Sequence, residues 1–163
     1  MSAIRLMTMA AGLALLAGCA GYGPPPGLRA GAPEAEVVNY MGPPTGHYAL
    51  PDGGQRLEFA RGPYGRDTFM VDVDAQHRVV RWDQVLTPKH FATLHAGMKA
   101  DDLLRAIGRP SERMGMMRDG QIWSWRYFNS DCLWWQAQLD AQGIVTSAGY
   151  GTDPRCDPPN DRR

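Results

Sequence analysis

The chain repeats itself at an offset of 66 residues, and this repetition constrains its fold more than any other feature. The stretch LRAGAPEAEVVNYMGPPTG begins at Leu28, and LHAGMKADDLLRAIGRPSE begins at Leu94. A leucine, an alanine, two glycines and a proline occupy the same columns of both stretches. Self-similarity at a fixed period indicates copies of one structural unit. We therefore expect two similar units, a degenerate first unit over 28–86 and a second over 87–152.

The residues that follow each stretch predict strands. Their apolar side chains alternate with polar ones, which is the period of a strand with one buried face. These apolar positions share columns in the two copies: Leu57, Phe59, Phe69, Val71 and Val73 match Trp123, Trp125, Trp135, Ala137 and Leu139. Turn sequences such as PDGG, NSD and DAQG separate the runs. We expect strands over about 55–61, 67–74 and 78–85, and over about 121–128, 132–140 and 144–150.

Each copy also predicts a short helix, over about 33–41 and about 100–107. Pro33 suits a first helical position, and Gly42 and Gly108 suit C-terminal caps. A further helix with Thr87 as its N-cap leads the second copy, whereas the first copy has the sequence GYGPPPG in that place. The expected class is α+β, with tandem units that each pack one or two short helices on a three-stranded antiparallel sheet.

The second copy resembles the SmpA/OmlA, or BamE-like, lipoprotein family. The resemblance rests on four motifs: Gly97-Met98, Gly108-Arg109-Pro110, the aromatic row Trp123/Trp125/Tyr127 and the hairpin Asp140–Gly143. It covers 87–152 well and 28–86 more weakly. Lys99 stands where the family usually has Ser or Thr, and the best-known members carry one unit. The resemblance implies protein binding on a small sheet within the outer-membrane β-barrel assembly machine. Tandem units of similar fold also occur in secreted β-lactamase inhibitors.

The N-terminus predicts export and lipidation. Arg5 precedes an apolar run over 6–17, which is too short to span a bilayer and is typical of a signal peptide. The following Leu16-Ala17-Gly18-Cys19 resembles the bacterial lipobox, in which the cysteine thiol receives a diacylglycerol and the freed amino group is usually acylated too. We expect 1–18 to be a lipoprotein signal peptide, Cys19 to be lipidated and 19–27 to be a Gly/Pro-rich tether. The alternatives are a plain signal peptide with a chance cysteine, or a short core helix.

The resemblance to such lipoproteins also predicts a location. Ala20 stands where an aspartate would retain the protein in the inner membrane. We therefore expect the protein on the outer membrane, facing the periplasm, with its acyl chains in the bilayer.

Two further cysteines, Cys132 and Cys156, remain in the chain. The periplasm is oxidising, and an even number of cysteines there favours a disulfide. The bond would hold the tail, 153–163, against the second unit. Two free thiols are the alternative.

Charge and motifs argue against several classes of function. The 17 basic residues are balanced by 17 acidic ones, so there is no strongly basic field for nucleic acid. The sequence has no CxxC or HxxxH pair for zinc, no GxSxG nucleophile and no glycine-rich phosphate loop. The four histidines, His47, His77, His90 and His95, are scattered. We expect no enzymatic activity, no cofactor and no metal.

Two groups of side chains are candidates for binding a partner. If the tryptophan rows of the second sheet point inward, Arg126, Phe128 and Trp134 point outward, and they are residue types that anchor interfaces. Alternatively, the tail covers them once Cys132 and Cys156 are joined. Three methionines, Met114, Met116 and Met117, form either a soft contact surface or part of a packed edge strand.

Taken together, the sequence predicts a lipid-anchored, non-catalytic module of the outer membrane. Its partners would be envelope proteins, with barrel-assembly components among them, and its role would lie in β-barrel assembly or envelope integrity. The alternative is a binder or inhibitor of a periplasmic enzyme on a tandem β-lactamase-inhibitor-like fold.

Overall fold

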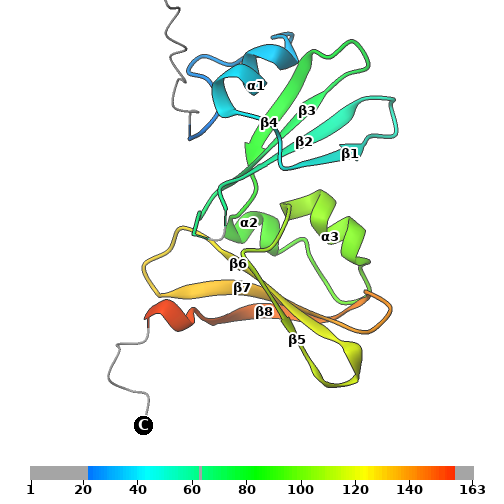
Figure 1. Cartoon of the computed structure of the whole chain (residues 1–163), viewed down its shortest axis with the longest axis vertical. Coiled ribbons are helices and arrows are strands. Elements are labelled where there is room, and N and C mark those ends of the chain that lie inside the picture. Colours follow the sequence, from blue (N-terminus) through cyan, green and yellow to red (C-terminus); the bar gives the residue numbers. More distant parts are fainter. Residues whose placement is uncertain (1–21, 63, 157–163) are drawn as a thin grey trace, which may run out of the picture.

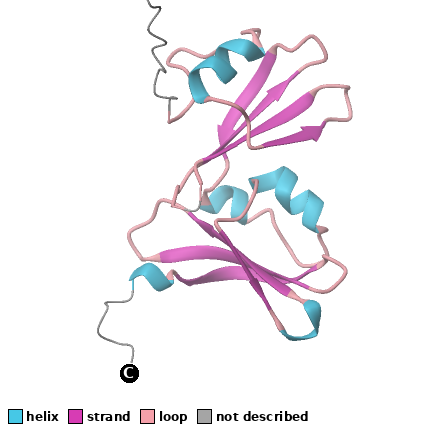
Figure 2. Cartoon of the chain, in the orientation of Figure 1, coloured by secondary structure: helices cyan, strands magenta, loops and turns pink. Residues whose placement is uncertain are grey.

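The computed structural model describes residues 22–62 and 64–156 of the chain. It contains two four-stranded antiparallel sheets, and the strands of each sheet follow one another in sequence order. Figure 1 shows the layers: one helix covers the outer side of the first sheet, and two further helices lie between the sheets. Figure 2 shows the predominance of strands over helices. The expected α+β class is confirmed.

The elements of the first half are a helix followed by a four-stranded meander: α1 (Glu34–Met41), β1 (Gly46–Ala49), β2 (Gln55–Ala60), β3 (Thr68–Val73) and β4 (Val79–Gln84). The second half has two helices before its meander: α2 (Pro88–Phe91), α3 (Ala100–Ile107), β5 (Glu112–Gly115), β6 (Gln121–Arg126), β7 (Leu133–Leu139) and β8 (Val145–Thr152). Two 3₁₀ turns complete the second half: Met117–Asp119 and Pro154–Cys156.

The prediction of three strands in each sheet is wrong, because each sheet has an additional edge strand. β1 pairs with β2 from Gly46 opposite Glu58, and β5 pairs with β6 from Glu112 opposite Ser124. Both strands have only four residues, and neither alternates apolar with polar side chains. They form because the turn after the preceding helix brings the backbone alongside a longer strand. Hydropathy patterning does not detect a strand of this kind.

The two halves share their topology and local details at the same offset of 66 residues as the sequence repeat. A bulge interrupts the last strand pair between Asp72 and Val73, and again between Gln138 and Leu139. Asp74 and Asp140, at corresponding hairpins, each accept hydrogen bonds from the backbone N–H groups two and four residues later. Such agreement extends the sequence repeat to the backbone hydrogen bonds.

The helix ends follow from the sequence in both copies. Gly42 and Gly108 close α1 and α3, with φ values of 85° and 77° that favour glycine. Their N–H groups donate to carbonyls four residues earlier, at 2.9 Å and 2.8 Å. Thr87 caps the one-turn α2 by accepting a hydrogen bond from the His90 N–H at 3.4 Å, and Pro88 follows at the first helical position.

Two cores hold the layers together. The first lies between α1 and the first sheet, and it buries Val37, Met41, Leu57, Phe59, Val71, Val73 and Val79. The second lies between the sheets, around α2 and α3, and it buries Phe91, Leu103, Ile107, Trp123, Trp125, Trp135 and Leu139. The expected inward rows are thus confirmed, although Phe69 is only partly buried.

The second core also contains side chains from the back of the first sheet. Met70 of β3 is buried in it, and Tyr48 of β1 packs against it. The α2–α3 layer therefore contacts both sheets, and the two halves are packed together rather than joined by a free linker.

A polar network joins the halves beside this core. The buried carboxylate of Glu58 accepts hydrogen bonds from Thr45 Oγ1 at 2.7 Å and from the Tyr48 hydroxyl at 2.5 Å. From the other half, Arg109 donates to it through its backbone N–H at 3.2 Å and through Nε at 3.0 Å. Burial and the hydrogen bond to Glu58 raise the pKa of Tyr48, so this hydroxyl stays protonated and remains a donor. The turn at 108–110 is therefore fixed to the first sheet.

A second ionic group lies on the same face of the first sheet. Asp72 is buried and accepts from Arg56 Nε at 2.6 Å, Arg56 Nη2 at 2.9 Å and Arg81 Nε at 2.7 Å. Burial acts to raise the pKa of Asp72, but the bonds from Arg56 and Arg81 outweigh it and hold that pKa below its usual value. Arg56 also donates to the Arg105 carbonyl of α3 at 3.1 Å, which places this ion group at the junction of the halves.

Asp72 is expected to make stability depend on pH. The pKa of Asp72 in the folded protein lies below the value of about 3.9 for an unfolded chain. The ionised side chain therefore contributes fully to the free energy of unfolding above about pH 3.9, and this contribution is lost as the pH falls through the folded pKa. Asp72→Asn should lower the free energy of unfolding at pH 7 by about 1.5–3 kcal/mol. The difference between the two proteins, measured by urea unfolding, should shrink below about pH 4.

The control for this experiment is Asp83→Asn, in the neighbouring strand. The Asp83 side chain is 61% exposed, so the change should alter stability by no more than about 0.5 kcal/mol. A difference between wild type and Asp72→Asn that stays constant from pH 7 to pH 3 would contradict the role given to Asp72.

Candidate interaction surfaces

The predicted outward cluster on the second sheet is not exposed. Arg126 and Trp134 do point away from the tryptophan core, but they are only 5% and 3% exposed. Asp153, just beyond β8, accepts from Arg126 Nε at 2.7 Å and from Arg126 Nη2 at 3.1 Å. The guanidinium lies 5.0 Å from the centroid of the Trp134 ring. The outward exposure on which the predicted binding role of these two side chains rested is therefore absent, and Asp153, at the start of the predicted tail, contacts Arg126 as the alternative of a covering tail expected.

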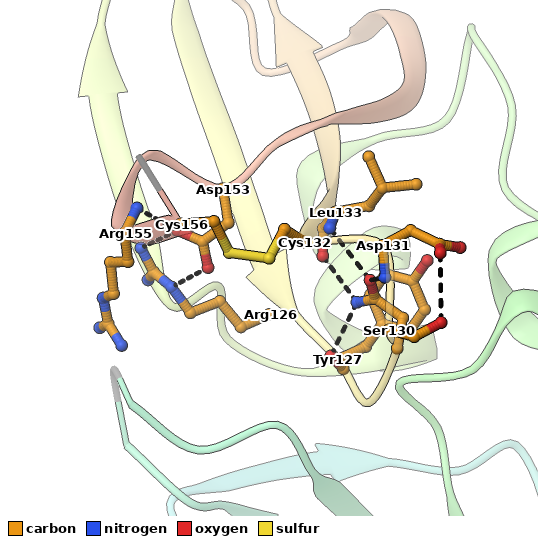
Figure 3. The surroundings of a disulfide bond; sticks show 10 residues. Arg126, Tyr127, Ser130, Asp131, Cys132, Leu133, Asp153, Arg155 and Cys156 are labelled. Atoms are coloured by element: carbon orange, nitrogen blue, oxygen red, sulfur yellow. Dashed lines mark hydrogen bonds and ion pairs between the residues drawn. A yellow bond between two sulfur atoms is a disulfide. The ribbon is translucent and has the colours of Figure 1, made fainter. Parts of the chain in front are cut away.

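A disulfide between Cys132 and Cys156 holds the covering segment in place, as expected. Figure 3 shows the bond beside the Arg126–Asp153 pair. The two Cα atoms are 5.9 Å apart, and the Asp153 N–H donates to the Cys132 carbonyl at 2.8 Å. Burial acts to raise the pKa of Asp153, but hydrogen bonds from Arg126 and from the Arg155 backbone lower it overall. The ion pair thus remains charged at neutral pH.

Phe128, the third residue of the predicted cluster, belongs to a different surface. It is 76% exposed in the loop between β6 and β7, and the Arg66 guanidinium lies 5.7 Å from its ring centroid. Tyr64, in the same β2–β3 loop as Arg66, is 77% exposed and lies 4.2 Å from the Arg155 guanidinium. The loops of the two halves therefore meet through pairs of one aromatic ring and one arginine.

A third such pair lies where the described chain begins. Tyr22 is 59% exposed, its hydroxyl donates to Asp67 Oδ2 at 2.8 Å, and the Arg61 guanidinium lies 5.6 Å from its ring. We call this surface the aromatic–arginine edge, made of Tyr22, Tyr64, Phe128, Arg61, Arg66 and Arg155. In Figure 1 the four segments that contribute to it, which are the start of the described chain, the β2–β3 loop, the β6–β7 loop and the C-terminal turn, lie along the left side of the molecule. Sequence patterning missed it because its members come from separate loops and the C-terminal turn.

The predicted tether is partly held by this contact. Besides the Tyr22 bond, the Leu28 N–H donates to the Pro25 carbonyl at 3.0 Å, and Leu28 packs against the first core. Residues 22–28 therefore lie against the first half. Cys19, the predicted lipidation site, lies outside the described residues.

The three methionines form an exposed surface. Every residue of β5 is exposed, and in the turn beyond it Met117 is 93% exposed. Arg118 and Asp119 have φ values of 62° and 60°, a conformation that non-glycine residues adopt infrequently. We call 114–120 the methionine hairpin. Met114 does lie in an edge strand, as one interpretation expected, but the expected packing is wrong, because Met114 and Met116 are 52% and 41% exposed.

The charged groups that border one cleft between the halves already have partners. This cleft, of about 200 Å³, is bordered by Arg56, Asp72, Arg81 and His90, and His90 Nε2 lies 3.1 Å from Asp83 Oδ2. Within the described part of the chain, no three His, Cys, Asp or Glu side chains are grouped so that they could hold a metal ion. Over the same residues, no helix has the length and apolar character needed to cross a membrane.

Comparison with known proteins gives little guidance. No family model matches the chain, and no curated protein matches it. Among solved structures, the chain is similar to an extracellular protein containing an SCP domain from Bacillus anthracis str. Ames, with 12% identity over 76% of this chain and a TM-score of 0.30. The match spans 44% of that chain. A likeness at this level carries no argument about fold or function, and the SmpA/OmlA resemblance stays a prediction from the sequence.

Proposed function

We propose that this protein is a lipid-anchored, periplasm-facing outer-membrane lipoprotein that binds other envelope proteins and does no chemistry itself. The observation that carries the binding role is the methionine hairpin. Methionine side chains are flexible and polarizable, and they are frequent on surfaces that bind proteins. Met114, Met116 and Met117 are all exposed within four residues, and exposed apolar side chains that are grouped in this way mark interaction sites more often than isolated ones do.

The backbone of the hairpin supports the same role. β5 pairs only with β6, so its other edge presents backbone N–H and C=O groups that no strand of the described chain meets. Such an edge can accept a strand from another protein, with main-chain hydrogen bonds giving affinity and the methionines giving apolar contact. The resemblance to SmpA/OmlA lipoproteins suggests barrel-assembly subunits as the partner.

The anchor is supported by Cys19 in its lipobox setting and by the disulfide. The bond between Cys132 and Cys156 suits an oxidising compartment such as the periplasm. Both features are those of a chain that leaves the cytoplasm.

Metabolic labelling tests the anchor. Cells that express the protein should incorporate labelled palmitate into it, and Cys19→Ser should abolish the label because the acceptor thiol is gone. Cys156→Ser is the matched control, since it removes a thiol from the other end of the chain and should keep the label. Equal labelling of wild type and Cys19→Ser would refute the lipid anchor.

Site-specific photocrosslinking tests the binding role. A photoreactive residue at position 117, in the cells where the protein is native, should give an adduct with an envelope protein. The same residue at Gln76, exposed in the turn between β3 and β4, should not. An adduct with a barrel-assembly subunit supports the proposal, whereas an adduct with a soluble periplasmic enzyme favours the inhibitor alternative. Equal adducts at both positions, or none at 117, would reject the hairpin as a binding surface.

A further inference from the structure

We propose that the aromatic–arginine edge lies on the surface of the phospholipid bilayer and sets the orientation of the protein there. The inference rests on the lipid anchor proposed above, and it adds a second, non-covalent contact with the membrane. The occupant of this surface is therefore a phospholipid leaflet rather than another protein.

The first argument is the length of chain between the anchor and the fold. Cys19 and Tyr22 are three residues apart, so their Cα atoms are separated by at most about 11 Å even in a fully extended chain. Tyr22 is fixed to the first half by its hydrogen bond to Asp67 and by its contact with Arg61. A lipid on the Cys19 sulfur must therefore bring the surface around Tyr22 close to the lipid headgroups.

The second argument is the chemistry of the edge. Tyr22, Tyr64 and Phe128 are among the most exposed large side chains of the described chain. Tyrosines are enriched at membrane–water interfaces, because the ring can enter the headgroup region while the hydroxyl stays hydrated. Phe128 offers an apolar ring of the kind that interfacial segments bury at the boundary between headgroups and acyl chains.

The arginines add attraction for phosphate. Arg61, Arg66 and Arg155 each lie against one of the three rings, at 5.6, 5.7 and 4.2 Å. An arginine near an anionic leaflet strengthens membrane binding through the surface potential. Three acidic residues lie on the same segments: Asp67 accepts hydrogen bonds from Tyr22 and from Gln84 Nε2 at 2.6 Å, Asp153 is paired with Arg126, and Asp131 is exposed in the β6–β7 loop and accepts from Ser130 Oγ at 3.1 Å.

The third argument is the position of the edge in the molecule. Figure 1 places the start of the described chain, the β2–β3 loop and the β6–β7 loop on the left side, and the β5–β6 turn at the lower right. With the edge on the bilayer, the methionine hairpin is directed away from the membrane. The two proposed contacts, lipid and protein, thus use different sides of the protein and do not compete.

Photolabelling from within the bilayer tests the inference. The acylated protein, purified in detergent, is reconstituted into vesicles of phosphatidylethanolamine and phosphatidylglycerol that contain a photoactivatable phospholipid, and the labelled peptides are identified by mass spectrometry. We expect label in 61–67 and 127–132 and little in 114–120. Arg66→Glu combined with Phe128→Ser should reduce label at the edge by at least about fivefold, the factor for losing one interfacial arginine. The matched pair Met117→Ser and Arg118→Glu on the hairpin should leave it unchanged.

The outcomes separate the two proposals. If the protein carries acyl chains but labels equally at the edge and the hairpin, or if the edge variant labels like the hairpin variant, the docking surface is refuted while the anchor stands. A purified protein whose mass lacks acyl chains would overturn the anchor and this inference with it. All four substitutions fall on exposed positions, and unchanged urea midpoints would show that both variants fold.

Discussion

Trp125→Ala is expected to lower the free energy of unfolding by about 3–5 kcal/mol, the range for truncating a large buried aromatic side chain. Trp125 is fully buried, its ring lies 5.4 Å from that of Trp135 and 6.2 Å from that of Trp123, and its Nε1 donates to the Gly108 carbonyl at 2.9 Å. The substitution leaves a cavity and also removes the donor for a carbonyl at the end of α3. Because small domains are stable by only about 5–15 kcal/mol, urea unfolding should show a large fall in the midpoint.

Two variants separate the causes of this loss. Trp125→Phe keeps a ring in the cavity but lacks the N–H group, so it should lose less stability than Trp125→Ala. Phe128→Ala removes an aromatic side chain that is mostly exposed, and it should change stability by no more than about 0.5 kcal/mol. If Trp125→Ala and Phe128→Ala had similar midpoints, Trp125 would not be the centre of the second core.

Removal of the disulfide is expected to cost about 3 kcal/mol, because the bond closes a loop between residues that are 24 positions apart. In the variant with both Cys132→Ser and Cys156→Ser, the segment that carries Asp153 loses its covalent tie. Trp134 should then become more accessible to water, since Asp153 accepts two hydrogen bonds, at 2.7 Å and 3.1 Å, from the Arg126 guanidinium that lies over its ring. Urea unfolding measures the first effect, and acrylamide quenching of tryptophan fluorescence measures the second.

The quenching signal has its own control. Placing Trp134→Phe in the same double-serine background should remove the additional quenching, because the other tryptophans that the structure describes as buried belong to the second core. The disulfide would have no role in covering this face if the double-serine variant unfolded at the wild-type midpoint and quenched no more strongly.

The sequence repeat predicted most of the fold, for a physical reason. Hairpin residues such as Asp74 and Asp140 act locally, through hydrogen bonds to backbone two and four positions away, and the inward rows obey the period of a strand. Both kinds of information lie in short windows of sequence. The short edge strands β1 and β5 carry neither the hairpin residues nor the alternating apolar pattern, because a strand of four residues held by backbone pairing needs no particular side-chain pattern.

The candidate sites were harder to predict for the opposite reason. Arg126 and Trp134 alternate correctly for an outward face, but their exposure depends on Asp153, which lies 27 residues from Arg126. The residues around Asp153 give no sign in the sequence that its carboxylate pairs with Arg126. The aromatic–arginine edge likewise exists only because separate loops meet where the halves join, so it has no signal in any one segment.

The helix layer between the sheets has a consequence for how the duplicated chain can be divided. α2 and α3 belong to the second copy in sequence, yet the back of the first sheet packs against the core around them through Met70 and Tyr48, and Glu58 accepts from Arg109 in the turn after α3. A fragment that ended before Thr87 would expose the side chains on that face to water, among them Met70 and Glu58, which are buried in the full chain. The first half therefore depends on helices of the second half to bury one face of its sheet, and we expect a first copy expressed alone to be less stable than the same residues in the full chain.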